Sequence, residues 1–369
     1  MSDDELLDLL RLNMVSGLGP RTMSLLLGRF GSASGILHAS GEELLAVSGV
    51  GPKLSAAITK ARSDDSAQTE LARCRESGVR LLTRDAADYP GLLAEICDAP
   101  PLLYCRGTLT EADGLAIGIV GSRQCTLYGR QQSERLASAL ARAGLTVVSG
   151  LARGIDEAAH RGALLADGRT IAVSATGLAN IYPPEHKTLA DEIAAQGALV
   201  SESPLDRGPS RGIFPQRNRI ISGLSLGVII IEANRKSGAL HTARHAMEQG
   251  REVFALPGRI DSLASQGCHD LIRDGATLIR GPDDVLEALG PLMQPVTTQD
   301  DQVIHTPREL SLTDQERSVL NLVTADPQHV DQLLQAVEIE TSRVLATLTM
   351  LEMKRLIRRL PGGFIVRAS

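Results

Sequence analysis

The sequence of 369 residues predicts an α/β protein whose centre is a doubly wound, mainly parallel sheet. Short apolar runs, each the length of a buried strand, alternate with helical stretches between residues 116 and 279. Small residues follow most of these runs, which is typical of a parallel sheet that binds a ligand at the carboxyl ends of its strands. Helical segments before this region, and helices with a hairpin after it, predict two smaller domains.

The central region contains the clearest pattern of secondary structure. Seven apolar runs predict strands at residues 116–120, 145–148, 170–174, 198–201, 227–231, 252–256 and 276–279. The intervening stretches predict helices at residues 130–143, 155–166, 185–195 and 239–249. Two further apolar runs, at residues 80–83 and 102–105, could extend one edge of the sheet. Parallel strands joined by helices predict helices on both faces.

The N-terminal segment contains two similar stretches about thirty residues apart. They are Val15-Ser16-Gly17-Leu18-Gly19-Pro20 and Val47-Ser48-Gly49-Val50-Gly51-Pro52-Lys53. A Gly-x-Gly turn at the start of a helix exposes backbone N–H groups, which can bind a phosphate without reading its base. The pair resembles tandem helix-hairpin-helix motifs. The alternative is that these glycines only make tight corners between helices.

The C-terminal segment predicts a small domain behind a linker. Residues 286–310 are acidic and rich in proline, as linkers often are. Helices are predicted at residues 313–324, 330–337 and 341–355, and a hairpin at residues 356–367 that turns at Pro361-Gly362-Gly363. Three helices and a β-wing make a winged helix. Arg343, Lys354 or the wing arginines could contact DNA, and contact with a protein or a structural role is an equal alternative.

The distribution of charge changes what the composition implies. The formal net charge of −6 and the scarcity of aromatic residues, four Phe, four Tyr and no Trp, argue at first against a nucleic-acid partner. The acidic excess, however, lies in residues 63–114 and 281–310. Residues 115–280 contain nineteen basic and fifteen acidic residues. The predicted sheet domain is therefore mildly basic.

Four arginines gather in one short part of that domain. They are Arg207, Arg211, Arg217 and Arg219, within thirteen residues that contain no acidic residue. Nearby glycines and prolines favour a loop, and a solvated loop without a ligand is the simplest interpretation of such a run. An anionic partner is the alternative.

The compartment is predicted from the N-terminus and the cysteines. Residues 1–5 are acidic where a signal peptide would be basic, and the apolar runs are too short to span a membrane. The five cysteines are scattered and form no Cys-x-x-Cys pair, which indicates reduced thiols and no zinc site. We expect a cytoplasmic protein with no metal and no bound cofactor.

The loop after the first predicted central strand could bind a phosphate. It contains Gly121-Ser122-Arg123, which combines backbone amides, a hydroxyl and a guanidinium. A dinucleotide is not expected, because the third glycine of Gly-x-Gly-x-x-Gly is missing and the second strand ends in Ser149-Gly150 without an acidic residue.

A pair of titratable residues follows the second strand. Asp156 and His160, four residues apart on a helix, could be an acid/base pair or a structural contact.

Many short motifs of residues 80–285 together resemble the family of DNA-processing protein A (DprA, also called Smf). The motifs, in chain order, are Tyr89-Pro90, Pro100-Pro101-Leu102-Leu103-Tyr104, Gly121-Ser122-Arg123, Tyr128-Gly129, Ser149-Gly150-Leu151-Ala152-Arg153-Gly154-Ile155-Asp156, Ala159-His160, Tyr182-Pro183, Ser201-Glu202, Phe214-Pro215-Gln216-Arg217-Asn218-Arg219-Ile220-Ile221, Glu232-Ala233, Lys236-Ser237-Gly238 and Pro257-Gly258.

The resemblance implies a non-enzymatic protein that binds single-stranded DNA with an extended Rossmann-like domain, dimerises through it, and loads RecA during natural transformation. The domains expected are a helix-hairpin-helix (SAM-like) domain at 1–62, the Rossmann-like domain at 63–285, a linker at 286–310 and a winged helix at 311–369. The family's DNA-binding positions correspond here to Gly121, Ser122, Arg123, Arg211, Phe214, Arg217, Asn218, Arg219, Lys236, Ser237 and Gly238. The arginines would engage phosphates and Phe214 would stack on a base.

A second hypothesis is a nucleotide-binding enzyme, such as a phosphoribohydrolase, that uses the same crevice on a small phosphorylated ligand. Enzymes of the lysine-decarboxylase-like group have a similar sheet and the motif Pro-Gly-Gly-x-Gly-Thr. This chain has Pro257-Gly258-Arg259-Ile260-Asp261 at that point, so it lacks the glycines that would hold the phosphate. The sequence therefore favours binding over catalysis.

Overall fold

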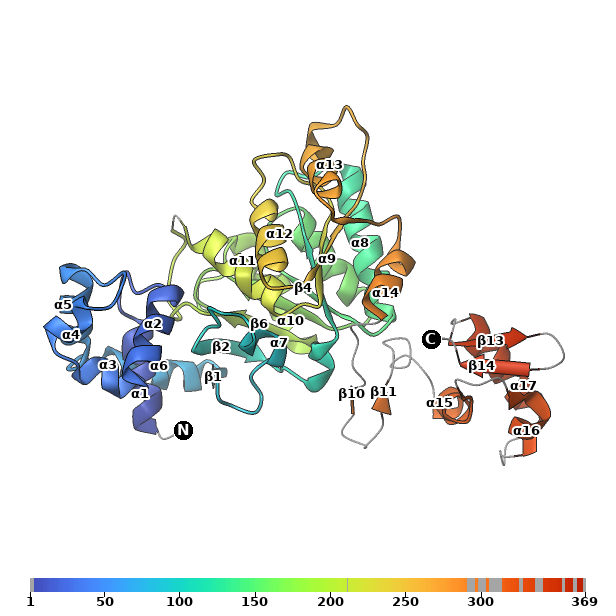
Figure 1. Cartoon of the computed structure of the whole chain (residues 1–369), viewed down its shortest axis with the longest axis horizontal. Coiled ribbons are helices and arrows are strands. Elements are labelled where there is room, and N and C mark those ends of the chain that lie inside the picture. Colours follow the sequence, from blue (N-terminus) through green and yellow to red (C-terminus); the bar gives the residue numbers. More distant parts are fainter. Residues whose placement is uncertain are drawn as a thin grey trace.

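The computed structural model describes residues 3–210 and 212–290, and the shorter stretches 296–297, 303–304, 314–324, 328–335, 341–353, 356–360 and 364–367. Its centre is a nine-stranded sheet with the order β1-β2-β6-β5-β4-β3-β7-β8-β9 (Figure 1). The strands are β1 (Val79–Thr83), β2 (Leu102–Gly107), β3 (Ala116–Val120), β4 (Thr146–Ser149), β5 (Thr170–Ser174), β6 (Ala198–Ser201), β7 (Gly227–Ile230), β8 (Glu252–Ala255) and β9 (Thr277–Leu278).

The seven strands from β3 to β9 are parallel, which confirms the predicted doubly wound, mainly parallel sheet. The chain builds outward from β3 on one side through β4, β5 and β6, and then returns to place β7, β8 and β9 on the other side. Strands β1 and β2 extend one edge in antiparallel fashion. The order of strands reverses between β3 and β7, and crevices in open α/β sheets form at this point.

Helices cover both faces of the sheet because successive residues of each strand point to opposite sides. Ile117 and Ile119 of β3 pack in one apolar cluster, and Ala116 and Val120 in another. The first cluster includes residues of α8 (Leu127–Arg142), α9 (Ile155–Leu164) and α14 (Pro282–Leu289). The second includes residues of α7 (Gly91–Ala94), α11 (Ile213–Gly223), α12 (Ala239–Glu248) and α13 (Gln266–Arg273). Helix α10 (Lys187–Gln196) packs against the edge near β6 and β2.

The N-terminal helices form a bundle beside β1 and β2 (Figure 1), and its apolar core is continuous with residues of the central domain such as Leu102 and Tyr104. They are α1 (Asp3–Asn13), α2 (Pro20–Phe30), α3 (Ala33–His38), α4 (Gly41–Leu45), α5 (Pro52–Ala61) and α6 (Ser66–Glu76). Gly17 and Gly49, with φ of 88° and 89°, make the two predicted turns that precede α2 and α5. Helix α6 packs against both α1 and β1.

Three polar contacts fasten the bundle to the central domain. Asn13 Nδ2 donates to the carbonyl oxygen of Glu202 at 3.1 Å. The backbone N–H of Leu205 donates to Glu70 Oε1 at 2.7 Å, and Arg73 forms an ion pair with Asp206. All three contacts reach the segment that follows β6, so this segment has a fixed position between the two domains.

The C-terminal elements confirm the predicted winged helix. They are α15 (Asp314–Asn321), α16 (Val330–Gln335), α17 (Thr341–Met353), β12 (Gln328–His329), β13 (Ile357–Leu360) and β14 (Phe364–Arg367). The strands form one sheet in the order β12-β14-β13 over a small apolar core. Two short strands, β10 (Val296–Thr297) and β11 (Val303–Ile304), pair with each other. Thr313, Lys354 and the turn at 361–363 lie outside the described residues.

In the part of the chain that the structure describes, no helix is both long enough and apolar enough to cross a membrane.

Candidate nucleic-acid interface

A crevice of about 890 Å³ opens at the point where the strand order reverses. Its floor is formed by the residues that follow β3 and β7, and one wall is the first half of α11. Eight of the eleven site residues expected from the sequence line this crevice, namely Gly121, Ser122, Arg123, Phe214, Arg217, Asn218, Ser237 and Gly238. Residues distant in sequence therefore converge on one surface.

The arginine run is half loop and half helix, so the loop favoured from its glycines and prolines is only partly correct. Helix α11 begins directly after Gly212, which has a φ of 89°. Pro215 lies in the first turn, where its missing N–H would have no partner within the helix. The helix places Phe214 and Asn218 on the side that faces the crevice.

The loop after β3 is held by Glu232, which follows β7. The N–H of Ser122 donates to the carbonyl oxygen of Glu232 at 2.7 Å. The Glu232 carboxylate accepts from Thr126 N at 2.8 Å and from Thr126 Oγ1 at 2.6 Å. Gly129 leaves room for this carboxylate, because a Cβ at that position would lie 2.5 Å from it. The loop that bears Arg123 is thus tied to both strands at the switch point.

Arg123, Phe214 and Tyr182 form a stack at the crevice. The guanidinium carbon of Arg123 lies 4.8 Å from the centre of the Phe214 ring, within the range of a cation–π contact. The ring of Tyr182 lies 5.7 Å from that of Phe214, tilted by 57°. Tyr182 was not among the site residues expected from the sequence, although the motif Tyr182-Pro183 was the signal that could have identified it.

Arg217 lies beneath the crevice and is buried, with only 6% of its surface exposed. Its Nη1 donates to the carbonyl oxygen of Gly150 at 2.7 Å and also to that of Val173. Burial lowers the pKa of Arg217 to about 10, so the side chain keeps its charge at neutral pH. These hydrogen bonds to backbone carbonyl oxygens occupy part of the guanidinium, which limits its direct contact with a ligand.

Asp156 is an acidic residue whose charge acts on that of Arg217. Its Oδ2 accepts from the N–H of Gly150 at 3.2 Å. Burial raises the pKa of Asp156 to about 6, while the charge of Arg217 opposes the rise. A Cβ at Gly150 would lie within 2.6 Å of both side chains, so glycine is required for this close packing.

Arg219 does not face the crevice, which disagrees with the phosphate contact expected for it. The side chain is 2% exposed. Its Nη2 lies 2.6 Å from Glu202 Oε1 and its Nε lies 3.1 Å from Asp98 Oδ2. Arg217 and Arg219 are two positions apart on a helix and therefore point in different directions. Arg219 joins three segments of the fold instead of offering its charge to solvent.

The remaining expected residues lie at the start of α12 or outside the description. Asn218 Nδ2 donates to the carbonyl oxygen of Gly238 at 3.3 Å, which links α11 to the start of α12. Lys236 is exposed beside this contact but does not line the crevice. Arg211 lies outside the described residues.

His160 has the surroundings of a structural residue. It is fully buried, and its Nδ1 lies 2.7 Å from Thr170 Oγ1. Burial lowers the pKa of His160 to about 3, so it is neutral at physiological pH. It does not line the crevice and has no hydrogen bond to Asp156, which leaves the acid/base pair considered from the sequence without geometric support. Among the described residues no group of His, Cys, Asp or Glu is arranged to bind a metal.

Comparisons with known proteins assign each part of this chain to a described family. Residues 80–290 match the family described as DNA recombination-mediator protein A, residues 304–363 match the DprA winged helix domain, and residues 8–64 match a SAM-like helix-hairpin-helix tandem. The chain is 35% identical to protein Smf of Synechocystis sp. over 95% of its own length and 96% of that protein.

Two solved structures are also similar. DNA processing protein A of Streptococcus pneumoniae has a TM-score of 0.65 and 36% identity, over 76% of this chain and 95% of that one. The protein of the same name from Helicobacter pylori, described for its single-stranded DNA binding mode, has a TM-score of 0.52 and 34% identity, over 58% of this chain and 97% of that one.

The raised pKa of Asp156 predicts a specific dependence of stability on pH. Between the ordinary value of 3.8 and about 6, the folded protein keeps a proton on Asp156 that the unfolded chain has lost. The corresponding stability is present below about pH 4 and is lost as pH rises through 6. Relative to an Asp156→Asn variant, the native sequence should lose about 3 kcal/mol of unfolding free energy between pH 4 and 7. Urea unfolding of both proteins across this range measures the difference, and parallel pH profiles would contradict it.

The ion pairs of Arg219 predict a stability defect in Arg219→Ala. Removing the guanidinium leaves Asp98 and Glu202 without their partner, and breaking a buried pair in this way costs about 3 kcal/mol or more. Arg280→Ala is the matched control, since Arg280 is 80% exposed in its pair with Asp284 and its removal should cost far less stability. Urea unfolding followed by circular dichroism compares them. Equal unfolding midpoints for the two variants would show that the buried ion pairs of Arg219 stabilise the fold no more than the exposed pair of Arg280.

Proposed function

This chain belongs to the family of DNA recombination-mediator protein A, and from that premise we propose that it binds single-stranded DNA in the crevice at the switch point. The observation that supports this most is the stack of Arg123, Phe214 and Tyr182. It offers an aromatic face and a positive charge together, and unpaired nucleotides combine a flat base with an anionic phosphate.

Each part of the crevice has a role in this proposal. Arg123 binds a phosphate, and the hydroxyl of Ser122 donates to the same group. Phe214, whose ring also contacts Tyr182 and Arg123, packs against one base. Asn218 hydrogen-bonds the backbone or a base edge. Gly121 lets the floor of the crevice pack closely on α9, because a Cβ there would lie 2.6 Å from Ile155.

Arg217 contributes in a different way from Arg123. Its charge is fixed below the floor by two backbone carbonyl groups, so it raises the electrostatic potential of the crevice without leaving its own position. With one stack and few hydrogen-bonding side chains, the crevice holds a strand mainly by its phosphates and reads little sequence.

We further propose that the protein is a recombination mediator of the cytoplasm that protects incoming single strands and helps load RecA during DNA uptake. The family description supports mediation of recombination. RecA is a partner expected from the resemblance, and its loading onto coated single strands can be followed by the ATPase activity of RecA with and without this protein.

The proposal predicts that Arg123→Ala binds single-stranded DNA at least about tenfold more weakly, since it removes both a phosphate contact and one face of the stack. The slope of log affinity against log salt should fall by about 0.7, the contribution of one phosphate on a single strand. Anisotropy titration of a labelled thymidine oligonucleotide at several salt concentrations measures both quantities. The unchanged protein should bind the single strand more tightly than a duplex of the same length.

Arg142→Ala is the matched control, because Arg142 is an exposed arginine at the end of α8, outside the crevice. Its removal changes the net charge by the same amount. Equal losses in the two variants, or an affinity that does not respond to salt, would reject the proposed function. Release of free base from nucleoside monophosphates would favour the enzyme hypothesis instead.

A homodimer through the central domain is also part of the proposal. Ile260 and Leu263 are 91% and 72% exposed in the segment between β8 and α13, and a second copy could bury them. Light scattering at several concentrations should show a dimer for the unchanged protein and a monomer for Ile260→Asp. Leu165→Asp, at a site 70% exposed at the end of α9, should remain dimeric. If the unchanged protein is a monomer at all concentrations, the proposed dimer is rejected, while the proposed binding of DNA in the crevice is not affected.

A further inference from the structure

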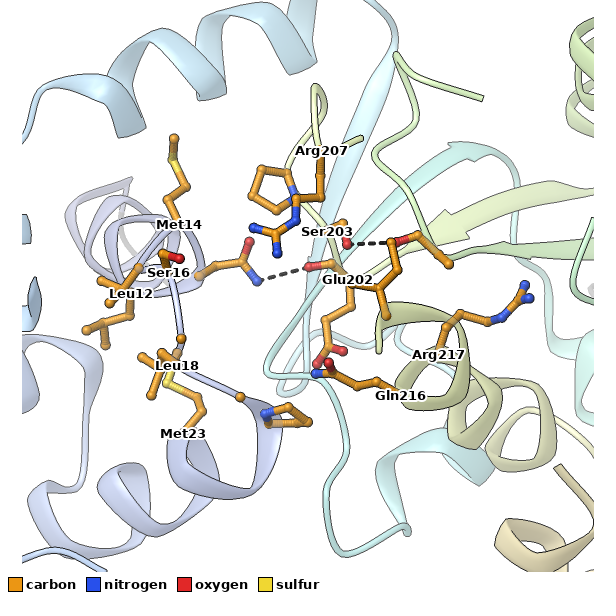
Figure 2. A pocket seen from close by; sticks show the side chains of 18 of the residues that line it. Leu12, Met14, Ser16, Leu18, Met23, Glu202, Ser203, Arg207, Gln216 and Arg217 are labelled. Atoms are coloured by element: carbon orange, nitrogen blue, oxygen red, sulfur yellow. Dashed lines mark hydrogen bonds between the residues drawn. The ribbon is translucent and has the colours of Figure 1, made fainter. Parts of the chain in front are cut away.

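A second cavity, of about 290 Å³, lies between the N-terminal bundle and the central domain (Figure 2). One side is the loop between α1 and α2, and the other is the segment after β6 together with the start of α11. A cavity of this size accommodates a small group such as a single base. Of the eleven site residues expected from the sequence, Arg217 is the one that lines this cavity, and it lines the crevice as well.

The N-terminal side is apolar with free backbone donors. Leu18 and Met23 lie together on this side of the cavity, opposite Gln216 (Figure 2). The backbone N–H groups of Gly17 and Gly19 have no hydrogen-bond acceptor among the described residues. The loop therefore offers an apolar surface beside unsatisfied donors.

The opposite side is polar. Glu202 and Gln216 point toward one another across it, and Arg207 reaches toward the N-terminal loop (Figure 2). The Gln216 side chain is exposed and has no partner in the described part of the chain, and Arg207 makes no ion pair there. Asn13 adds a buried Oδ1 that lacks a described donor, since its Nδ2 alone is used by Glu202. Amide and carboxylate groups of this kind recognise the edges of bases.

Helix α11 separates this cavity from the crevice. Ile213 and Gln216 face the cavity, whereas Phe214 and Asn218 face the crevice. The segment before the helix also borders both, through Arg207 on one side and Ser210 on the other. A strand needs to cross only the width of one helix, about 10–12 Å, to pass between them.

We propose that the cavity binds one further nucleotide of the same single strand, which rests on the proposed function of the crevice. Its base lies against Leu18 and Met23, with its edge toward Gln216 and Asn13. Its phosphate lies at the rim, near Arg207 and the free N–H groups of the loop. The N-terminal domain is thus a direct part of the DNA interface in this chain.

Hydrogen exchange of the full chain, with and without a thymidine oligonucleotide long enough to span both cavities, tests the proposal. The N–H groups of Gly17 and Gly19 are unbonded, so they should exchange rapidly in the free protein and several-fold more slowly in the complex. The second loop is an internal control: Gly49 and Gly51 belong to the same motif but do not line the cavity, and their exchange should not change.

Two substitutions give an independent measurement. Gln216→Ala and Arg207→Ala should each weaken binding of the long oligonucleotide about three- to tenfold, the value of one or two hydrogen bonds. Binding of a short oligomer that fills only the crevice should not change. Gln131→Ala and Arg142→Ala, exposed positions on α8, are the matched controls and should bind both oligomers as the unchanged protein does.

The outcomes separate the inference from the proposed function. If exchange slows in the loop after β3 but not at Gly17 and Gly19, the strand does not enter the cavity and the inference is wrong, while the crevice retains its function. Equal slowing at Gly17 and Gly49 would indicate general stiffening of the bundle and would also overturn it. If neither region changes and neither oligomer binds, the proposed function itself fails.

Discussion

The buried guanidinium of Arg217 is the constraint on which the arrangement of both cavities depends. It donates to backbone carbonyl groups at the ends of β4 and β5, and it faces the carboxylate of Asp156. These contacts fix the start of α11 over the carboxyl edge of the sheet. Because an α-helix has about 3.6 residues per turn, the neighbours of Arg217 are then divided between the two sides of α11. Phe214 reaches the crevice and Gln216 the cavity beneath the N-terminal bundle.

A second set of contacts fixes α11 through Arg219, which follows Arg217 by two residues in the same helix. Arg219 joins the helix to Asp98, before β2, and to Glu202, after β6. The backbone carbonyl of Glu202 in turn accepts from Asn13 of the N-terminal bundle. Glu202 therefore connects α11, which borders the crevice, with the N-terminal bundle, which borders the cavity. This continuity explains why a segment far from the sheet can complete a surface at its edge.

The sequence predicted the strands of the sheet well because buried strands and their small C-terminal residues leave a local pattern. Ala116–Val120 and Thr170–Ser174 were predicted to the residue. Helix α11 was obscured because Gly212 and Pro215 are typical of loops, and both are also compatible with a helix start. The separate roles of Arg217 and Arg219 could not be predicted, since their partners lie far away along the chain. Tyr182 lies in the motif Tyr182-Pro183, but it was overlooked because its contact with Phe214 forms only in the folded chain.

The burial of two arginines changes what the charge of the domain can do. Four arginines within thirteen residues suggest a strongly positive surface, yet Arg219 is neutralised by two carboxylates and Arg217 is held by backbone oxygens. Arg123, Arg153 and Arg207 have exposed side chains at the two cavities in the described chain, and Arg153 is already in an ion pair with Glu185, so Arg123 and Arg207 are the ones without a carboxylate partner there. They lie on opposite sides of α11. A polyanion that is to meet both charges must cross the helix, and a short anion that fits one cavity meets only one of them. The separation of Arg123 and Arg207 by α11 therefore favours binding of an extended nucleic-acid strand over binding of a small phosphorylated ligand.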